Sequence, residues 1–123
     1  MSDEALDIQV TDILIYLGIP VSCKGYDYLR CSIILAYHSP DITKYITKTL
    51  YPKVARLCHA SDAAGVERNC RHAVERACHI GRIFEFGRYF DCDITHRHPT
   101  CAQFISAIAR RLHEISAEFD SRQ

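Results

Sequence analysis

The stretch that decides the fold is PKVARLCHASDAAGVERNCRHAVERACHIG, residues 52–81. Its pattern predicts a short helix opened by Pro52, a tight turn, and a longer helix that Ser61 or Asp62 caps and Gly81 ends. Apolar side chains recur on one face of the longer helix at helical spacing: Val66, Cys70, Ala73, Val74, Ala77 and Ile80. Its opposite face carries Glu67, Arg68, Arg71, His72, Glu75, Arg76 and His79. Two helices joined in this way are typical of a helix-turn-helix unit.

The polar face of the longer helix allows two interpretations. Arginine can bond bidentately to guanine and glutamate can accept from cytosine, so Glu67, Arg68 and Arg71 could contact successive base pairs in a major groove. The same face also contains the i,i+4 pairs Glu67–Arg71 and Arg71–Glu75, which occur on any exposed helix. From spacing alone, a solvated face is favoured over a recognition face.

Helical periodicity also governs the rest of the chain. We expect a first helix that Asp3 caps and Gly18 ends, and a second over about residues 26–37. Ser39 and Pro40 open a third, which breaks at Tyr51 because a residue before proline avoids helical angles. A short helix at 83–89 and a last helix near the C-terminus follow. The apolar side chains that these helices carry at helical spacing are Leu6, Ile8, Val10, Ile13, Leu14, Leu17, Leu29, Ile33, Ile34, Tyr37, Ile42, Tyr45, Ile46, Leu50, Val54, Ala55, Leu57, Phe104, Ile105, Ile108, Leu112 and Ile115. The prediction is a single all-α domain, residues 1–123, of six or seven helices with a helix-turn-helix at about 52–81.

Composition and charge narrow the class of protein. The chain has 123 residues, 48% of them hydrophobic and 24% charged, which is typical of a folded protein with a core. Its formal net charge is zero, so affinity for an anionic partner has to come from local clustering of cations. No signal peptide and no apolar run of the roughly 20 residues needed to span a bilayer is present. We therefore predict a cytoplasmic protein without membrane attachment.

The cysteines and histidines suggest little chemistry. Seven cysteines, an odd number with no CxxC pair, are expected to be free thiols in a reducing compartment. The one local group of zinc-type ligands is Cys92, His96, His98 and Cys101, whose spacing fits no common zinc site, so solvated loop side chains are expected. Neighbouring Cys-His pairs on a helix point apart and cannot form a nucleophile–base couple. We expect no cofactor and no enzymatic activity; a small metalloenzyme built on this loop is the weakest hypothesis.

Four runs occur together and in order: IPVSCKGYDYLR (19–30), YITKTLYPKVAR (45–56), GVERNCRHAVERACHIG (65–81) and HPTCAQFISAIARRL (98–112). In this combination the chain resembles, over roughly residues 10–115, the C-terminal effector domain of the stage-zero sporulation transcription factor of endospore-forming bacteria. The resemblance implies an all-helical domain that binds short promoter boxes in double-stranded DNA. It implies that Glu67, Arg68 and Arg71 face the bases, and it assigns backbone-positioning roles to Lys24 and Lys48.

Further DNA contacts follow from residue chemistry, because cations beside a reading helix position the protein on phosphates. The residues expected in this role are Lys53, Arg56, Arg76 and Arg82, and His72 could also donate to a phosphate. A single module buries only about 600–1,000 Å² on DNA, so two copies on adjacent boxes, a homodimer on DNA, are expected.

Two departures from the resembled family leave an alternative open. The segment RIFEFGRYFDCDI, residues 82–94, matches poorly, although the resemblance implies that this region lies near the surface that contacts the RNA polymerase sigma subunit. The residues before the first helix motif are also too few to hold the receiver domain of the family protein. The alternative is a protein-interaction module that pairs with or antagonises a full-length regulator without binding promoters itself.

Overall fold

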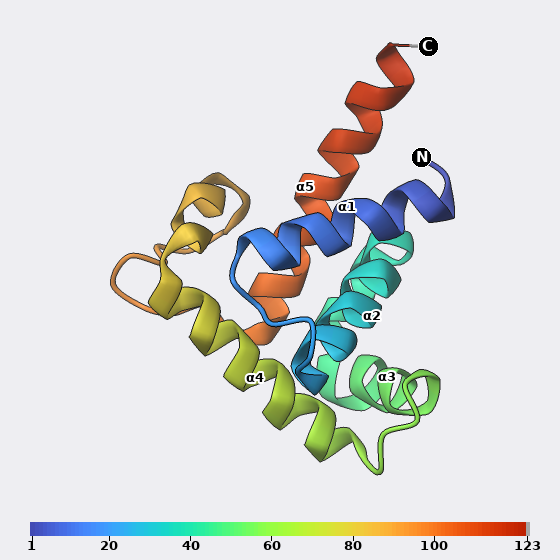
Figure 1. Cartoon of the computed structure of the whole chain (residues 1–123), viewed down its shortest axis with the longest axis vertical. Coiled ribbons are helices and arrows are strands. Elements are labelled where there is room, and N and C mark those ends of the chain that lie inside the picture. Colours follow the sequence, from blue (N-terminus) through green and yellow to red (C-terminus); the bar gives the residue numbers. More distant parts are fainter. Residues whose placement is uncertain (123) are drawn as a thin grey trace.

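The computed structural model describes residues 1–122. All of its regular structure within that range is helical, which confirms the predicted all-α class (Figure 1). The segments are α1 (Asp3–Tyr16), α2 (Lys24–His38), the 3-10 turn η1 (Pro40–Tyr45), the π-helical turn η2 (Ile46–Leu50), α3 (Tyr51–Leu57), α4 (Ala63–Ile80), the 3-10 segment η3 (Arg82–Tyr89) and α5 (Cys101–Ser121).

The core lies around α2, which contacts α1, α3, α4 and α5. Burial of large aliphatic side chains is the main driving force for this packing, at roughly 25 cal/mol per Å² of apolar surface. The largest fully buried side chains come from α1, α2 and α5 and from the segments between helices, namely Leu6, Leu14, Leu17, Ile19, Leu29, Ile33, Leu50, Ile83, Phe104, Ile105, Ile108 and Leu112. The C-terminal turns of α5 project beyond this body, on the side away from α3 (Figure 1).

The unit formed by α3 and α4 is a helix-turn-helix with defined caps. At the end of α3, the amide of Ala60 donates to the Ala55 carbonyl at 2.8 Å and that of His59 to Arg56 at 3.4 Å, with His59 left-handed at φ 57°. This is a Schellman arrangement, which satisfies the last carbonyls of a helix. At the start of α4, the Asp62 carboxylate accepts from the Gly65 amide at 2.7 Å, and Gly81 ends the helix at φ 91°. Both predicted ends of α4 are therefore confirmed.

The predicted break at Tyr51 is wrong. Tyr51 has helical angles of φ −63° and ψ −41°, and η2 and α3 follow one another directly at this point. The backbone leaves helical angles earlier, at Tyr45, with φ −122° and ψ 42°. Pro52 has no amide hydrogen, but it stands in the first turn of α3, where that hydrogen would have no partner inside the helix. The Tyr51 amide reaches back five residues to the Ile46 carbonyl, and this wider turn carries the chain through the proline.

The cap of α1 also differs from expectation: Ser2, not Asp3, accepts from the Ala5 amide at 3.1 Å. Four side chains expected among the apolar members are largely exposed, namely Ile8, Tyr45, Leu57 and Ile80. In α4 the place of Ile80 is taken by Cys78, which is buried. Ile80 instead lies over Gly18, where a Cβ would come within 2.1 Å of its Cδ1 atom, so the loop after α1 passes close to the end of α4.

Candidate nucleic-acid interface

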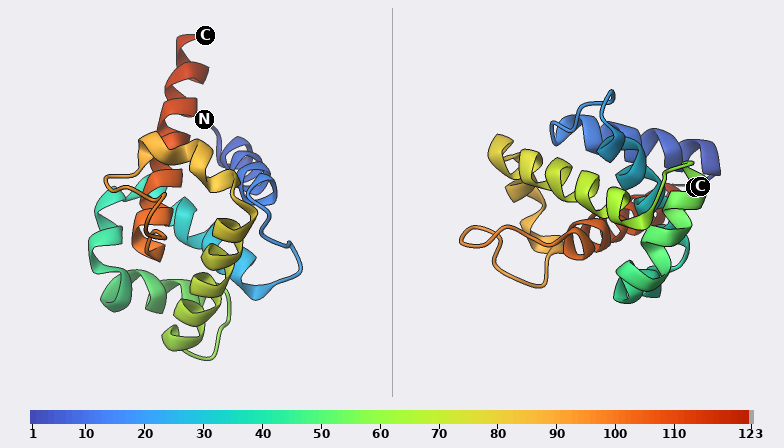
Figure 2. Two further views of the ribbon diagram at one scale, coloured as in Figure 1. Left: turned by 90° about the vertical axis from the view of Figure 1, so that its left-hand side faces the viewer. Right: turned by 90° about the horizontal axis from the view of Figure 1, so that it is seen from below.

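Helix α4 runs along one outer edge of the molecule, and its ribbon lies in front in the view of that side (Figures 1 and 2). The side chains predicted for its polar face are outside the core: Arg68, Arg71, His72, Glu75, Arg76 and His79 are exposed, and Glu67 is partly exposed. Val66, Cys70, Ala73, Val74 and Ala77 face inward. The two faces of α4 are thus divided as the sequence predicts, except at Ile80 and Cys78.

The polar face has a centre and two flanks. Because successive residues turn by about 100° around a helix axis, Arg68 and Glu75 lie near the middle of the exposed arc. Glu67 and Arg71 lie on the flank that borders the N-terminus of α5, where they line a groove together with residues 98–102. His72 and Arg76 lie on the opposite flank, in a hollow that they share with Pro20. A partner that lies along α4 would therefore meet Arg68 first.

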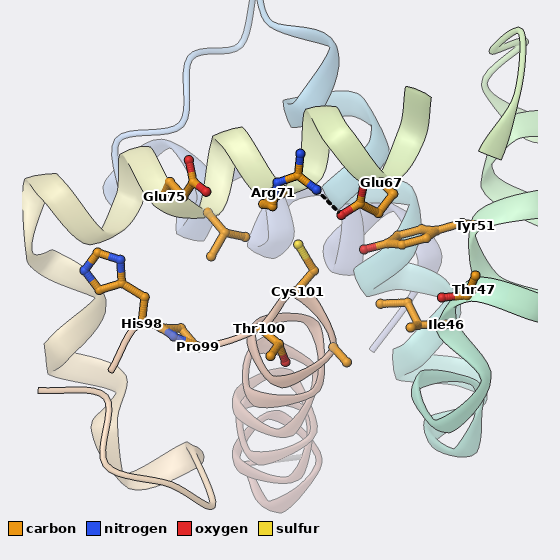
Figure 3. Close-up of a pocket in the computed structure, with 12 residues that line it drawn as sticks. Ile46, Thr47, Tyr51, Glu67, Arg71, Glu75, His98, Pro99, Thr100 and Cys101 are labelled. Atoms are coloured by element: carbon orange, nitrogen blue, oxygen red, sulfur yellow. Dashed lines mark hydrogen bonds and ion pairs between the residues drawn. The ribbon is translucent and has the colours of Figure 1, made fainter. Parts of the chain in front are cut away.

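Glu67 and Arg71 form an ion pair on this face, with 2.5 Å between Oε1 and Nη1 (Figure 3). Their side chains are 42% and 49% exposed respectively, and pairs this open to solvent contribute only about 0.2–1 kcal/mol. The pair thus orients Arg71 and can be exchanged for other partners at small cost.

Apart from Arg71, the Lys and Arg side chains of the helix-turn-helix unit have no ion pair within the described chain. Among residues 1–122, ion pairs within 4.0 Å engage Arg30, Lys44, Arg71, Arg88, Arg110 and Arg111, whereas five of the predicted contact residues have none: Lys24, Lys53, Arg56, Arg68 and Arg76. Outside the unit, Arg82, Arg97 and Arg122 also have none in that range. Lys48 on η2 and His72 on α4 likewise have no acidic partner in that range. Lys24, at the start of α2, shares a surface hollow with His59 and Ser61 of the turn. Unpaired cations thus gather on and around α3, the turn and α4.

Arg82 has a different environment from the other predicted phosphate contacts. Its Nη1 donates to the Tyr16 carbonyl at 2.9 Å, and its guanidinium lies 5.0 Å from the centre of the Tyr16 ring. The Tyr16 hydroxyl donates to the Glu85 carboxylate at 2.6 Å, and this hydrogen bond raises the pKa of Tyr16. Arg82 therefore ties the end of α1 to η3.

A groove of about 430 Å³ opens between α4, η2 and the N-terminus of α5 (Figure 3). Its apolar lining comes from Ile46, Val74, Pro99 and Ala102, and its polar lining includes Glu67, Arg71 and Glu75. The hydroxyl of Tyr51 and the thiol of Cys101 point toward each other beneath α4. No pattern along the sequence indicates this groove, because its walls come from three separate segments, residues 46–51, 67–75 and 98–102.

The weak zinc candidate is not supported. Among residues 1–122, no cluster of three or more His, Cys, Asp or Glu side chains has the geometry to hold a metal ion. Cys92 is exposed, His96 lies 3.8 Å from Asp93, and Cys101 faces the groove. The His98 ring lies edge-on to His79, with 6.2 Å between ring centres. The four side chains of this weak candidate thus lie in different surroundings, and Cys101 already belongs to α5. All seven thiols are free, as predicted.

Sequence reasoning missed two features of this surface: the groove beside α4 and the left-handed His59. The sequence held only a weak indication of the left-handed His59. A tight turn was predicted between the two helices, but residues 58–62 contain no glycine, so another residue has to take the left-handed angles.

None of the helices within residues 1–122 combines the length and the apolar character that a bilayer crossing requires.

The comparison with known families matches these observations. The family model described as the C-terminal part of the sporulation initiation factor Spo0A matches residues 10–112. The match includes α2, the whole helix-turn-helix and most of α5, and with them every residue predicted to contact DNA. This family consists of DNA-binding transcription factor domains and is not an enzyme family. With the match extending over most of its length, the chain belongs to the Spo0A C-terminal domain family of sporulation initiation factors.

Proposed function

We propose that this protein is a sequence-specific regulator of transcription that inserts α4 into the major groove of double-stranded DNA. The observation that carries the proposal is the gathering, on and around the helix-turn-helix unit, of six cations without an ion-pair partner within 4.0 Å among residues 1–122: Lys24, Lys48, Lys53, Arg56, Arg68 and Arg76. Unpaired surface cations are free to replace the counterions of phosphates, which supplies nearly all of the non-specific affinity of proteins for DNA and a large share of the specific affinity.

Base contacts are assigned to Glu67, Arg68 and Arg71. Arg68 is exposed near the middle of the face and has no competing acid within 4.0 Å among residues 1–122, so its guanidinium can bond bidentately to one guanine. Arg71 is held by Glu67, and the pair can address neighbouring base pairs together: the guanidinium donates to a guanine while the carboxylate accepts from a cytosine amine. A carboxylate beside an arginine also disfavours phosphate, so this pair contributes to specificity more than to affinity.

Phosphate contacts are assigned to the cations around that centre. His72 and Arg76 flank the face on α4, Lys53 and Arg56 belong to α3, and Lys24 stands beside the turn. Lys48, on η2, precedes α3 by one turn. These contacts would position α4 on the duplex but would not read its sequence.

The wider proposal concerns assembly and location. Two copies on adjacent boxes are expected, because one module of this size covers only about 600–1,000 Å² of DNA-facing surface. Contact with the RNA polymerase sigma subunit is assigned to η3, which exposes Phe84 between Arg82 and Glu85. A regulator of this kind acts in the bacterial cytoplasm, without a cofactor.

The test begins with selection of bound duplexes from a random library, followed by titration of the selected box at several salt concentrations. Arg68→Ala should weaken binding to that box by about 1–3 kcal/mol and relax the preference at one base pair. The matched control is Arg122→Ala, which removes an arginine at the far end of α5 and should leave the affinity unchanged. Equal binding by the Arg68→Ala protein and the parent would remove the base-reading assignment, and affinity without salt dependence would remove the DNA proposal itself.

A further inference from the structure

The groove beside α4 has the form of a ligand site between two capped helices. One wall is α4, whose start is fixed by the Asp62 cap, with 2.7 Å between the carboxylate and the Gly65 amide. The opposite wall is the first turn of α5, where Thr100 and Gln103 form a reciprocal capping box with bonds of 2.9 and 3.1 Å. Its volume of about 430 Å³ falls in the usual range for small-molecule pockets, about 300–1,000 Å³.

The lining of the groove is divided into an apolar floor and a charged rim. Val74 and Pro99 are buried side chains of the floor, and Ile46 and Ala102 are partly buried beside them. Glu67, Arg71 and Glu75 follow one another along the rim at intervals of one helical turn (Figure 3). A ligand that fits this division has an apolar body and one polar end.

The rim has an excess of negative charge. The guanidinium of Arg71 is engaged by Glu67, whereas Glu75 has no ion-pair partner within 4.0 Å in the described range 1–122. The thiol of Cys101, on the floor, is affected by the same groups. Burial is the main cause of its raised pKa; the Glu67 and Glu75 carboxylates raise it further, while the Tyr51 hydroxyl and Arg71 lower it. The unbalanced carboxylate of Glu75 therefore favours a cation at the rim.

We propose that the groove between α4, η2 and the N-terminus of α5 binds a small amphipathic cation, an amine or amidine carried on an aromatic or branched aliphatic body. The cationic group pairs with Glu75, and the body lies on Val74, Pro99 and Ala102. Tyr51, a residue that is only 3% exposed, lines one side of the groove, with its hydroxyl directed toward Cys101. Because Glu67 and Arg71 belong both to this rim and to the DNA-facing side of α4, occupancy of the groove would be sensed at the reading helix.

The test uses the full chain without DNA, so that its outcome is independent of the proposed DNA binding. Phenethylammonium is titrated at neutral pH and constant ionic strength while backbone amide signals are followed by NMR. Two control ligands are titrated in the same way: phenylacetate, which has the same ring but the opposite charge, and methylammonium, which has the same charge but no ring. We expect saturable shifts with phenethylammonium alone, concentrated on Val74, Cys101 and Ala102.

Two variants and one control locate the site. Glu75→Gln removes the carboxylate of an exposed residue and should weaken phenethylammonium binding by about fivefold, as expected for a partly solvated ion pair. Ala102→Leu fills the groove without changing a charge and should abolish saturation. Glu4→Gln removes one exposed carboxylate from the first turn of α1 and should bind like the parent. Equal binding of phenylacetate and phenethylammonium, or unchanged binding by Glu75→Gln, would overturn the proposal even if Ala102→Leu failed to fold.

Discussion

Gly25, in the first turn of α2, lies directly against the backbone of Asn69 in α4. A Cβ atom at position 25 would come within 2.5 Å of the Asn69 carbonyl oxygen and 2.9 Å of the Ala73 Cβ atom. Only glycine allows the two helices to cross this closely. The contact fixes the position of α4 at its middle and places Lys24, the preceding residue, next to the helix-turn-helix.

We expect Gly25→Ala to destabilise the protein by about 1–3 kcal/mol, since the added methyl group meets backbone atoms that cannot turn aside. Urea unfolding measures this change. The sign of the change in stability decides the question, because alanine is favoured over glycine by about 1 kcal/mol in a helix without such a contact. A gain in stability would therefore show that the two helices do not pack closely here. Gly87→Ala, with no atom within 4 Å of the added Cβ, is the control and should change stability by less than about 0.5 kcal/mol.

His59 is the one residue other than glycine that the structure gives a positive φ within residues 1–122. The left-handed conformation costs an ordinary residue about 1–2 kcal/mol in the folded state, and glycine avoids this cost. Glycine also has greater conformational freedom in the unfolded chain, which cancels part of the gain in stability. His59→Gly should therefore raise the unfolding free energy by about 0.5 kcal/mol, which the midpoint of urea unfolding would report. His59→Val, with its branched Cβ, should lower it. Should both variants unfold at the same midpoint, the turn does not have the conformation described.

The ends of α4 could be predicted because their causes are local. Asp62 bonds to an amide three residues away, and Gly81 has the left-handed angles that end helices. The predicted break at Tyr51 failed because the rule for residues before proline is also local. Tyr51 and Leu50 are both buried, and the packing that buries them holds the chain in helical angles through Pro52.

The polar face of α4 could be predicted for a similar reason, since helical periodicity alone separates Arg68 and Arg71 from Val66 and Val74. The contacts that particular side chains on and near that face make in the folded protein could not be predicted from the sequence. Arg82 bonds to the carbonyl of Tyr16, a residue 66 positions away in the chain, and such a contact leaves no signal in the sequence around either residue. Cys101 belonged to a local group of zinc-type side chains along the chain, but its place at the start of α5 decided its neighbours.

Lys24 and Arg82 should differ in DNA binding, although the sequence assigned phosphate contacts to both. Removal of one phosphate contact weakens binding to all duplexes alike and lowers the slope of log affinity against log salt by about one. We expect this result for Lys24→Ala, measured by titration at several salt concentrations. Arg82→Ala should leave the salt slope unchanged and lower the unfolding free energy instead, because it removes the bond to Tyr16. A lowered salt slope in Arg82→Ala would restore its predicted phosphate role.

Alkaline pH should weaken the fold through its buried thiols. Burial raises the pKa of Cys31 to about 12 and also raises that of Cys70, from an ordinary value of 9.0. A thiol whose folded pKa is raised contributes stability that is complete below pH 9 and is lost as the pH rises toward the folded pKa, because the unfolded chain releases the proton first. For Cys70, which is buried against the core, the loss approaches about 1.4 kcal/mol per pH unit above 9.

Urea unfolding in a reducing buffer at pH 8, 9 and 10 should therefore give a falling free energy of unfolding for the parent. The free energy of unfolding of the Cys70→Ala protein should fall less steeply over the same range. Cys92→Ala, which removes an exposed thiol, should follow the parent; if Cys70→Ala also follows it, the Cys70 thiol is not kept protonated by the fold.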